Sequence, residues 1–354
     1  MPHCVITGGA GFIGSNLANY YLSKLRPVTI LDNFSRPGSE QNLAWLKARH
    51  GSLLNVVRAD ICDRKGPLAE TVASAEVVFH LAGQVAVTTS VTDPRHDFEV
   101  NALGTFNVLE AVRQSQSKPI VLYSSTNKVY GKLADLGIVE RGGRYAYSTV
   151  ASGIGEERPL DPYSPYGCSK CTGDQYFLDY ARIYDLKTVV FRQSCIYGPR
   201  QFGMEDQGWL AWFAISGLLE NPVTIFGDGK QVRDILYVED LIEAYDAAVR
   251  HIDVTAGKAY NVGGGPENTL SLLELVEILN RSFGRKIDCS FDDWRPGDQP
   301  VFISNIAKAK TDFGWQPRIG VEEGVRRLLE WIKANEGLFA QKLQPALAGT
   351  GGNK

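Results

Sequence analysis

Short apolar runs rich in β-branched residues alternate with longer amphipathic stretches through the first half of the chain. The strand candidates span residues 3–8, 27–32, 54–60, 76–83, 119–125 and 187–194. The helical patterns between them span residues 11–25, 39–50, 93–114 and 164–184. Strands that are apolar throughout are typical of a parallel sheet covered by helices on both faces. The pattern therefore predicts an α/β protein built on a doubly wound parallel sheet, the Rossmann architecture.

The pattern changes after about residue 195, where Gly and Pro separate shorter elements. Residues 234–252 again have the pattern of a strand followed by a helix, and 269–284 and 320–337 have helical periodicity. We expect a second, smaller mixed α/β domain that binds substrate and lies against the first.

The expected domains are interleaved along the chain. The dinucleotide-binding domain takes residues 1–193 with a returning segment at about 232–262, and the substrate domain takes 194–336. The last stretch, residues 341–354, lacks periodicity, and we expect residues 337–354 to form a disordered tail.

Charge and cysteine usage narrow the classes of protein. The 354 residues hold 37 Lys and Arg against 40 Asp and Glu, a net charge of −3, which offers no attraction to nucleic acid. No apolar run is long enough to span a membrane, and the start MPHCVITGG lacks the basic and apolar segments of a signal peptide. Six cysteines are too sparse for a disulfide framework, so we expect a cytoplasmic enzyme.

Two cysteines form a C-x-x-C motif, Cys168 and Cys171. No second ligand pair accompanies them, and the histidines are scattered along the chain. The motif also lies within a predicted helix. We therefore expect small-residue packing there and no metal site.

A glycine-rich segment, TGGAGFIG at residues 7–14, falls between the first predicted strand and the first helix. In this context Gly8 permits a tight turn, Gly11 lets the backbone approach a pyrophosphate, and Gly14 lets the helix pack on the strand. Free N–H groups at the start of the helix would hold the anion. The segment predicts a dinucleotide site.

An acidic residue, Asp32, ends the second predicted strand. Its carboxylate can accept hydrogen bonds from both adenosine ribose hydroxyls and would repel a 2′-phosphate, which favours NAD over NADP. Arg36 follows closely and leaves NADP open as an alternative.

Tyr166 and Lys170 lie one helical turn apart on the same face of a predicted helix. A free tyrosine has a pKa of about 10, and a neighbouring ammonium or a positive nicotinamide would lower it. Such a pair is usually an amphipathic surface. Here the strand before it ends in the hydroxyls Ser124, Ser125 and Thr126, at the edge of the sheet where ligands bind.

Taken together, these motifs resemble the extended short-chain dehydrogenase/reductases, in particular the nucleotide-sugar epimerases and dehydratases. The motifs that match, over about residues 1–335, are TGGAGFIG, Asp32, ADI (59–61), HLAGQ (80–84), Asn101, YSSTNKVYG (123–131) and SPYGCSK (164–170).

The resemblance implies a role for each matching residue. Thr126 hydrogen-bonds the reacting sugar oxygen, Tyr166 is the acid/base, and Lys170 holds the nicotinamide ribose and tunes Tyr166. The expected contacts to NAD are Gly8, Gly11, Phe12, Ile13, Gly14, Asp32, Asn33, Ser35, Arg36, Asp60, Ile61, Leu81, Ala82, Gly83, Gln84, Asn101, Ser124, Tyr166 and Lys170.

For the substrate, the resemblance implies that Arg233 and Arg295 bind the diphosphate and Asp298 the nucleotide ribose. Cys195 stands near a position where the family often has an asparagine, which leaves that diphosphate contact open. The other candidate contacts to sugar or nucleotide are Asn127, Lys128, Gln207, Trp209 and Gln231.

The dehydratases of this family carry Thr-Asp-Glu where this chain has Thr126-Asn127-Lys128. A neutral amide and a cation cannot eliminate water as that acid and base do, so we expect an epimerase. Segments 160–170, 191–202 and 206–213, with an insertion of about 30 residues before SPYG, resemble the branch that inverts C2 of CDP-sugars.

That branch implies NAD-dependent epimerisation of a CDP-sugar by transient oxidation at C2 and return of hydride to the opposite face. The resemblance also implies a homodimer formed through helices 93–114 and 164–184. Two alternatives stay open: a UDP-sugar 4-epimerase with the same catalytic residues, and a non-catalytic NAD-binding protein.

Overall fold

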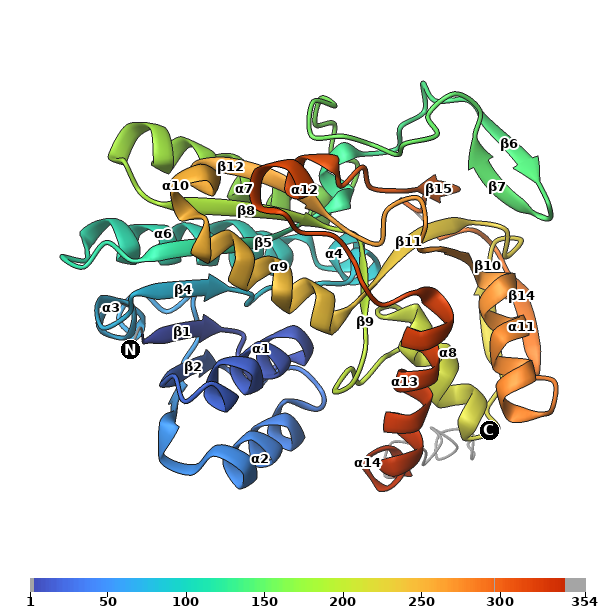
Figure 1. The fold of residues 1–354 in the computed structure, drawn as a ribbon, viewed down its shortest axis with the longest axis horizontal. Helices are drawn as coiled ribbons and strands as arrows, with labels where there is room; N and C mark the ends of the chain where they lie inside the picture. The colour runs from blue at the N-terminus through green and yellow to red at the C-terminus, as the bar shows by residue number, and fades with distance from the viewer. Residues whose placement is uncertain (1–2, 296, 341–354) are drawn as a thin grey trace, which may run out of the picture.

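The computed structural model describes residues 3–295 and 297–340. Its centre is a seven-stranded sheet of order β12-β8-β5-β4-β1-β2-β3, parallel throughout (Figure 1). The strands are β1 (Cys4–Thr7), β2 (Val28–Asp32), β3 (Leu54–Arg58), β4 (Val77–His80), β5 (Ile120–Thr126), β8 (Thr188–Gln193) and β12 (Lys258–Val262). The predicted doubly wound sheet is confirmed.

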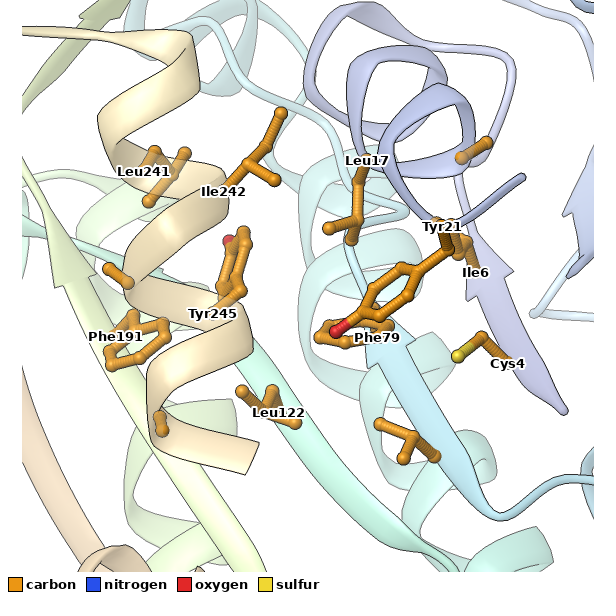
Figure 2. Packing of buried hydrophobic residues seen from close by; sticks show 14 of the residues in the cluster. Cys4, Ile6, Leu17, Tyr21, Phe79, Leu122, Phe191, Leu241, Ile242 and Tyr245 are labelled. Atoms are coloured by element: carbon orange, nitrogen blue, oxygen red, sulfur yellow. The ribbon is translucent and has the colours of Figure 1, made fainter. Parts of the chain in front are cut away.

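Helices cover both faces of this sheet, which explains why its inner strands are apolar throughout. One face carries α1 (Phe12–Ser23), α2 (Ser39–His50), α9 (Val238–Arg250) and α12 (Ala307–Phe313). The other carries α3 (Leu68–Ala73), α6 (Thr105–Gln114) and α7 (Pro165–Tyr184). Figure 2 shows the first face, where Tyr21 of α1 and Tyr245 of α9 meet Phe79 of β4, with ring centroids 5.5 and 5.7 Å apart.

The second domain has its own small sheets and its own core. Its strands are β9 (Cys195–Tyr197), β10 (Val223–Phe226), β11 (Val232–Tyr237), β13 (Thr269–Ser271), β14 (Cys289–Asp292) and β15 (Val301–Phe302). Its helices are α8 (Trp209–Leu218), α11 (Leu272–Phe283) and α13 (Val321–Ala334). Leu275, Leu279, Val325 and Leu328 are fully buried in this core. The insertion before α7 holds the hairpin of β6 (Ile138–Arg141) and β7 (Arg144–Tyr147).

The segment that returns to the first domain is shorter than the predicted 232–262. Strand β11 pairs with β9, β13 and β15 in the second domain, so within this segment α9, the short α10 (Ile252–Thr255) and β12 return. Helix α12, outside the predicted segment, also packs against the central sheet. Residues 232–250 do form a strand and a helix, as predicted, but the strand that pairs with β8 at the edge of the central sheet is β12. The boundary between the two domains depends on which strands pair, and periodicity does not reveal that.

Two predicted helices are also subdivided. Residues 93–114 contain α5 (Pro94–Phe98), a π-helical turn η2 (Glu99–Gly104) and α6. In the segment 269–284 the first three residues form β13, and α11 begins at Leu272 because Ser271 and Glu274 form a reciprocal capping box.

The predicted tail does not begin at residue 337. Residues 337–340 form a short helix α14 (Gly337–Ala340), and Phe339 is buried against Phe202 and Trp331. The rest of the predicted tail, 341–354, lies outside the described residues.

Candidate active site

The carboxyl ends of β1, β4 and β5 meet at one edge of the central sheet. The strand order reverses between β1 and β4, and such a switch point is where open α/β sheets bind ligands. The glycine loop follows β1, Leu81–Gln84 follow β4, and Thr126 ends β5. The topology thus brings the predicted cofactor and catalytic segments to one place.

The glycine loop has the shape of a phosphate cradle. Gly8 has φ +68°, and a Cβ there would lie 2.7 Å from the backbone nitrogen of Ala82. A Cβ on Gly14 would lie 2.3 Å from the Gly8 carbonyl oxygen, whereas one on Gly11 would meet only that oxygen, at 3.1 Å. No side chain caps α1, so the N–H groups of its first turn are left for an anion. This geometry fits the pyrophosphate of a dinucleotide.

Asp32 lies beside the cradle and is nearly buried. It accepts hydrogen bonds from the backbone N–H of Ala10 at 2.9 Å and of Phe34 at 2.7 Å. Burial raises the pKa of its carboxyl, and the two hydrogen bonds oppose that rise. The next loop is tied across to β3, because Asn33 donates to Asp60 at 2.8 Å. The residues expected at an adenosine ribose therefore lie together.

A buried acceptor without a partner marks the other end of the cofactor site. Asn101, in the π-helical turn, donates to Asp97 and to the Gln84 carbonyl, each at 2.9 Å, but its Oδ1 accepts nothing among the described residues. A Cβ on Gly83 would lie 2.9 Å from that Oδ1 and 3.9 Å from Lys170 Nζ. Asn101 Oδ1 and the Lys170 ammonium lie on either side of Gly83, which has no side chain. This arrangement leaves room for a ribose and offers hydrogen bonds to its hydroxyls.

Helix α7, which carries Tyr166 and Lys170, begins at residues that favour a helix start. Ser164 caps α7 by accepting the Gly167 N–H at 3.0 Å, and Pro165 occupies the first helical position. Tyr166 therefore sits in the first turn and Lys170 one turn later. The hydroxyl of Thr126 donates to Asn127 Oδ1 and accepts the Lys128 N–H, each at 3.3 Å. Thr126 also acts to lower the pKa of Tyr166.

In the protein by itself, burial raises the pKa of Tyr166 to about 12, and Thr126 only partly offsets this. Burial also lowers the pKa of Lys170 to about 7, and Asp97 and Asp174 oppose that change. The Lys170 Nζ lies 4.3 Å from the ring centre of Tyr123. A positive charge bound beside the phenol would lower its pKa.

Between the two domains, Tyr166 and Thr126 open onto a cavity of about 360 Å³. Of the predicted residues, those that line it are Phe12, Ile13, Ser124, Thr126, Asn127, Lys128, Tyr166, Gln207, Trp209, Gln231, Arg233, Arg295 and Asp298. The cavity is thus lined from both domains, with the catalytic side chains on the side of the central sheet.

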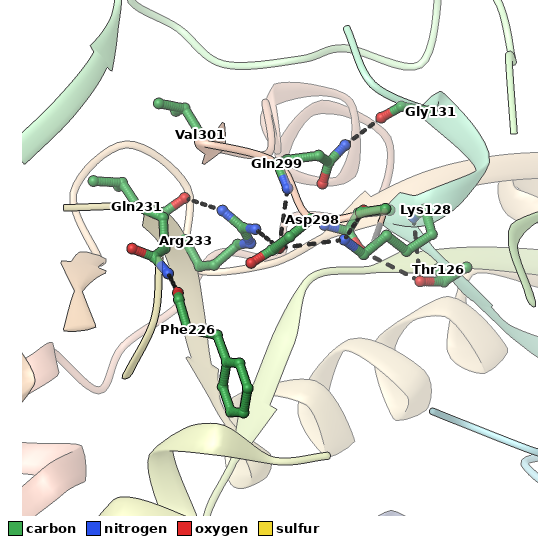
Figure 3. A network of polar contacts seen from close by, with 12 residues as sticks. Thr126, Lys128, Gly131, Phe226, Gln231, Arg233, Asp298, Gln299 and Val301 are labelled. Atoms are coloured by element: carbon green, nitrogen blue, oxygen red, sulfur yellow. Dashed lines mark hydrogen bonds and ion pairs between the residues drawn. The ribbon is translucent and has the colours of Figure 1, made fainter. Parts of the chain in front are cut away.

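The proposed diphosphate groups lie on the second domain. Arg233 pairs with Asp298 and donates to the Val232 carbonyl, and it is 8% exposed (Figure 3). Arg295 lies 3.8 Å from the ring centre of Phe226 and donates to the Glu205 carbonyl at 2.9 Å. Guanidinium groups at a cavity wall are suited to bind phosphate.

Some predicted contacts are engaged elsewhere. Arg36 donates to Gln207 at 2.8 Å, which ties the loop after β2 to the wall of the cavity. Gln84 bonds to both backbone groups of Ala86, and Ile61 belongs to the apolar core. For Ile61 this leaves only the backbone for contact with a cofactor.

The sequence reasoning missed several lining residues. They are Val85, Val87 and Thr88 after β4, Gln193 and Ser194 at the end of β8, and Thr224 and Phe226 on β10. The residues after β8 could have been found, because that strand was predicted and its carboxyl end faces the same edge as β5. Thr224 and Phe226 come from the other domain, and no local pattern indicates them.

Cys168 and Cys171 are free thiols. Within the described ranges, no three His, Cys, Asp or Glu side chains are grouped so as to hold a metal ion. No helix in residues 3–295 and 297–340 is long and apolar enough to cross a membrane.

The sequence model of the family described as GDP-mannose 4,6 dehydratase matches residues 5–328. This chain belongs to that family of extended short-chain dehydrogenase/reductases, which confirms the predicted class of nucleotide-sugar epimerases and dehydratases.

Individual relatives of this chain are also nucleotide-sugar epimerases. CDP-paratose 2-epimerase of Salmonella typhi is 44% identical over 339 residues, which cover 93% of this chain and 99% of that protein. A putative UDP-glucose 4-epimerase of Methanocaldococcus jannaschii is 33% identical over 331 residues, with 94% and 98% covered. The solved UDP-glucuronic acid 4-epimerase of Bacillus cereus, in complex with UDP-glucuronic acid and NAD, superposes with a TM-score of 0.80 at 27% identity and coverage of 94% and 99%. Its NAD agrees with the cofactor that the glycine cradle and Asp32 predict.

Proposed function

We propose that this protein is an NAD-dependent epimerase that inverts C2 of a CDP-sugar. The substrate pair is CDP-paratose and CDP-tyvelose, with CDP-glucose and CDP-mannose as a second pair. The observation that carries the proposal is one cavity with Thr126 and Tyr166 on one wall and Arg233 and Arg295 on another. The identity to CDP-paratose 2-epimerase supports C2 as the reacting carbon.

NAD would be held by the glycine cradle, Asp32, Asn101 and Lys170. When bound, it supplies a reversible hydride acceptor, so that C2 is oxidised transiently to a ketone and reduced again on the opposite face. Tyr166 takes the proton of the C2 hydroxyl and returns it, and Thr126 orients that hydroxyl. The guanidinium groups of Arg233 and Arg295 hold the diphosphate while the sugar turns.

A UDP-sugar 4-epimerase is the second candidate, because relatives of that activity are similar along nearly their whole length. A panel of CDP-paratose, CDP-glucose, UDP-glucose and UDP-glucuronic acid, followed by NMR without added cofactor, separates the two. We expect turnover of a CDP-sugar at C2. Turnover of UDP-sugars at C4 alone would establish the second candidate, and no turnover of any member would favour a non-catalytic NAD-binding protein.

The fate of the C2 hydrogen tests the route. C2 has no adjacent carbonyl to acidify its hydrogen, and the proposed route uses one proton-transfer tyrosine, Tyr166, rather than two bases on opposite faces of the sugar. Substrate deuterated at C2 should therefore give product that keeps deuterium at C2 in ordinary water. Loss of the label at the rate of epimerisation would contradict transient oxidation.

A homodimer through α5–α7 is also part of the proposal. Large apolar side chains are exposed on these helices, among them Phe98 (55%), Phe106 (36%) and Tyr176 (43%), and the last two are in ring contact at 5.7 Å. A patch of this kind commonly marks an interface. Light scattering should report a dimer that Phe106→Glu weakens; a wild-type monomer would contradict it.

A further inference from the structure

A line of polar side chains runs along the cavity wall from the proposed proton-transfer group to the proposed diphosphate site. Figure 3 shows Lys128 between Thr126 and Asp298, and Asp298 paired with Arg233. All four line the cavity. Lys128 is therefore the cation of this line that lies next to Thr126, and Arg233 lies farther away, on the other side of Asp298.

The backbone holds Lys128 in this place. The Thr126 hydroxyl accepts its N–H at 3.3 Å, and the 3-10 turn η3 (Asn127–Tyr130) begins directly after β5. Thr126 and Lys128 are thus parts of one turn, so a ligand that reaches the hydroxyl is also within reach of the lysine side chain.

The ammonium of Lys128 has unused hydrogen-bonding capacity. It donates to the Gly297 carbonyl at 3.3 Å, and Asp298 lies 3.8 Å away, beyond hydrogen-bond distance. An ammonium has three donors. Among the described residues the other two have no partner within hydrogen-bond distance, and the side chain is 20% exposed on the cavity.

The position of the diphosphate relative to the reacting carbon differs between the two candidate reactions. C2 is bonded to the anomeric carbon that carries the diphosphate, whereas C4 lies on the far side of the sugar ring. An enzyme that presents C2 to its proton-transfer groups must therefore accommodate a phosphate close to them. A phosphate brought there needs a cation beside Thr126.

We propose that Lys128 binds the sugar-linked phosphate in the pose that presents C2 to Thr126 and Tyr166, and so determines which carbon reacts. This inference rests on the proposed function and assigns the position of the reaction to one side chain. Arg233 and Arg295 then bind the remaining part of the diphosphate, and the Asp298 carboxylate lies between Arg233 and Lys128.

Inhibitor binding tests the contact without catalysis, because CDP carries the second phosphate and CMP does not. In Lys128→Met we expect the dissociation constant of CDP to rise about 10- to 100-fold, the range of a charge-assisted hydrogen bond, with that of CMP nearly unchanged. Lys128→Arg should keep most of the CDP affinity. Lys230→Met is the matched control, since Lys230 pairs with Glu140 outside the cavity.

Equal losses for CDP and CMP in Lys128→Met would make the lysine a structural brace, and an unchanged preference for CDP would remove it from the phosphate site. Either result overturns the inference. If the wild type inverts C2 of no CDP-sugar, the proposed function fails, while the preference for CDP over CMP still reports on the phosphate contact.

A second measurement on the wild type remains available if the variant does not fold. Burial and Arg233 lower the pKa of Lys128 to about 8, and Asp298 opposes this. The other titratable group that faces it is the Cys195 thiol, whose pKa is raised by burial. The preference for CDP over CMP should fall as the pH rises through about 8, and Lys128→Arg should abolish that fall. A preference that does not change from about pH 7 to 9 would overturn the inference.

Discussion

The two walls of the cavity are built in different ways. The wall on the central sheet consists of contiguous segments, the end of β5 and the first turns of α7, braced from behind by the buried Asp174–Arg192 pair at 2.9 Å. The opposite wall is assembled from β9, β10, β11 and two loops that are far apart in sequence. In the proposed function, the first wall carries the proton-transfer groups and the second binds the nucleotide sugar. On that assignment, short segments of sequence determine the type of reaction, whereas the packing of distant segments determines the choice of substrate.

We expect the largest effect from replacing Tyr166, the proposed proton-transfer group of the first wall. Tyr166→Phe should fold and bind NAD, and lose activity by about 10²- to 10⁴-fold because phenylalanine cannot exchange a proton. Steady-state kinetics and the NAD content measure both parts. Tyr163→Phe, in the same segment but 52% exposed, should stay near wild type. Wild-type turnover by Tyr166→Phe would exclude that residue from the mechanism.

The brace behind the first wall comes next. Asp174 is fully buried and receives two hydrogen bonds from Arg192 and one from Ser125. Asp174→Ala leaves the buried guanidinium of Arg192 without its carboxylate partner, although the Tyr130 hydroxyl still accepts a hydrogen bond from it at 3.2 Å. The substitution should lower the free energy of unfolding by about 3–5 kcal/mol.

Asp179→Ala on the same helix is the control for this prediction. It removes an exposed pair with Arg182 and should cost less than about 1 kcal/mol. Denaturant unfolding measures both variants. Similar losses in the two would mean that the buried pair does not brace α7.

The third prediction tests whether the Asp32 side chain both binds NAD and determines the preference for NAD over NADP. Asp32→Ala should weaken NAD binding by about 10-fold or more and narrow the preference over NADP, because the carboxylate accepts ribose hydrogen bonds and repels a 2′-phosphate. Fluorescence titration with both cofactors measures the ratio. If the ratio does not change, another residue selects the cofactor, and Arg36 is the first to examine.

The smallest effect concerns the link between the walls. Arg36→Ala removes the 2.8 Å hydrogen bond to Gln207 and should raise the KM for the nucleotide sugar several-fold with little change in kcat, the size of one partly exposed hydrogen bond. Because both residues act through this bond, the double variant with Gln207→Ala should be no worse than either single one. Additive losses would show that the two side chains act separately.

The first wall and the cofactor site could be predicted in detail. Gly8, Gly11 and Gly14 between a strand and a helix, Asp32 at a strand end, and Tyr166 and Lys170 one turn apart are local patterns, and the structure brings them together. The rise in the pKa of Tyr166 that burial causes could not be predicted. Helical spacing shows which charges are near, but the cost of burial depends on the surroundings.

The second wall could be predicted only as a set of candidates. The resemblance indicated Arg233, Arg295 and Asp298 as candidates. It did not indicate the ion pair of Arg233 with Asp298 or the hydrogen bond from Arg36 to Gln207. These contacts join positions that no periodicity relates.

By itself, the sequence determined the alternation of strands and helices, the glycine loop and the spacing of Tyr166 and Lys170 on one helix face, because each depends on residues close together in the chain. The tertiary structure alone decided that β11 pairs with strands of the second domain, and that Lys128 lies between Thr126 and Asp298. It also decided that Asn101 Oδ1 has no partner among the described residues. The physical reason is that hydrogen-bond partners, burial and cavity shape depend on which distant segments pack together.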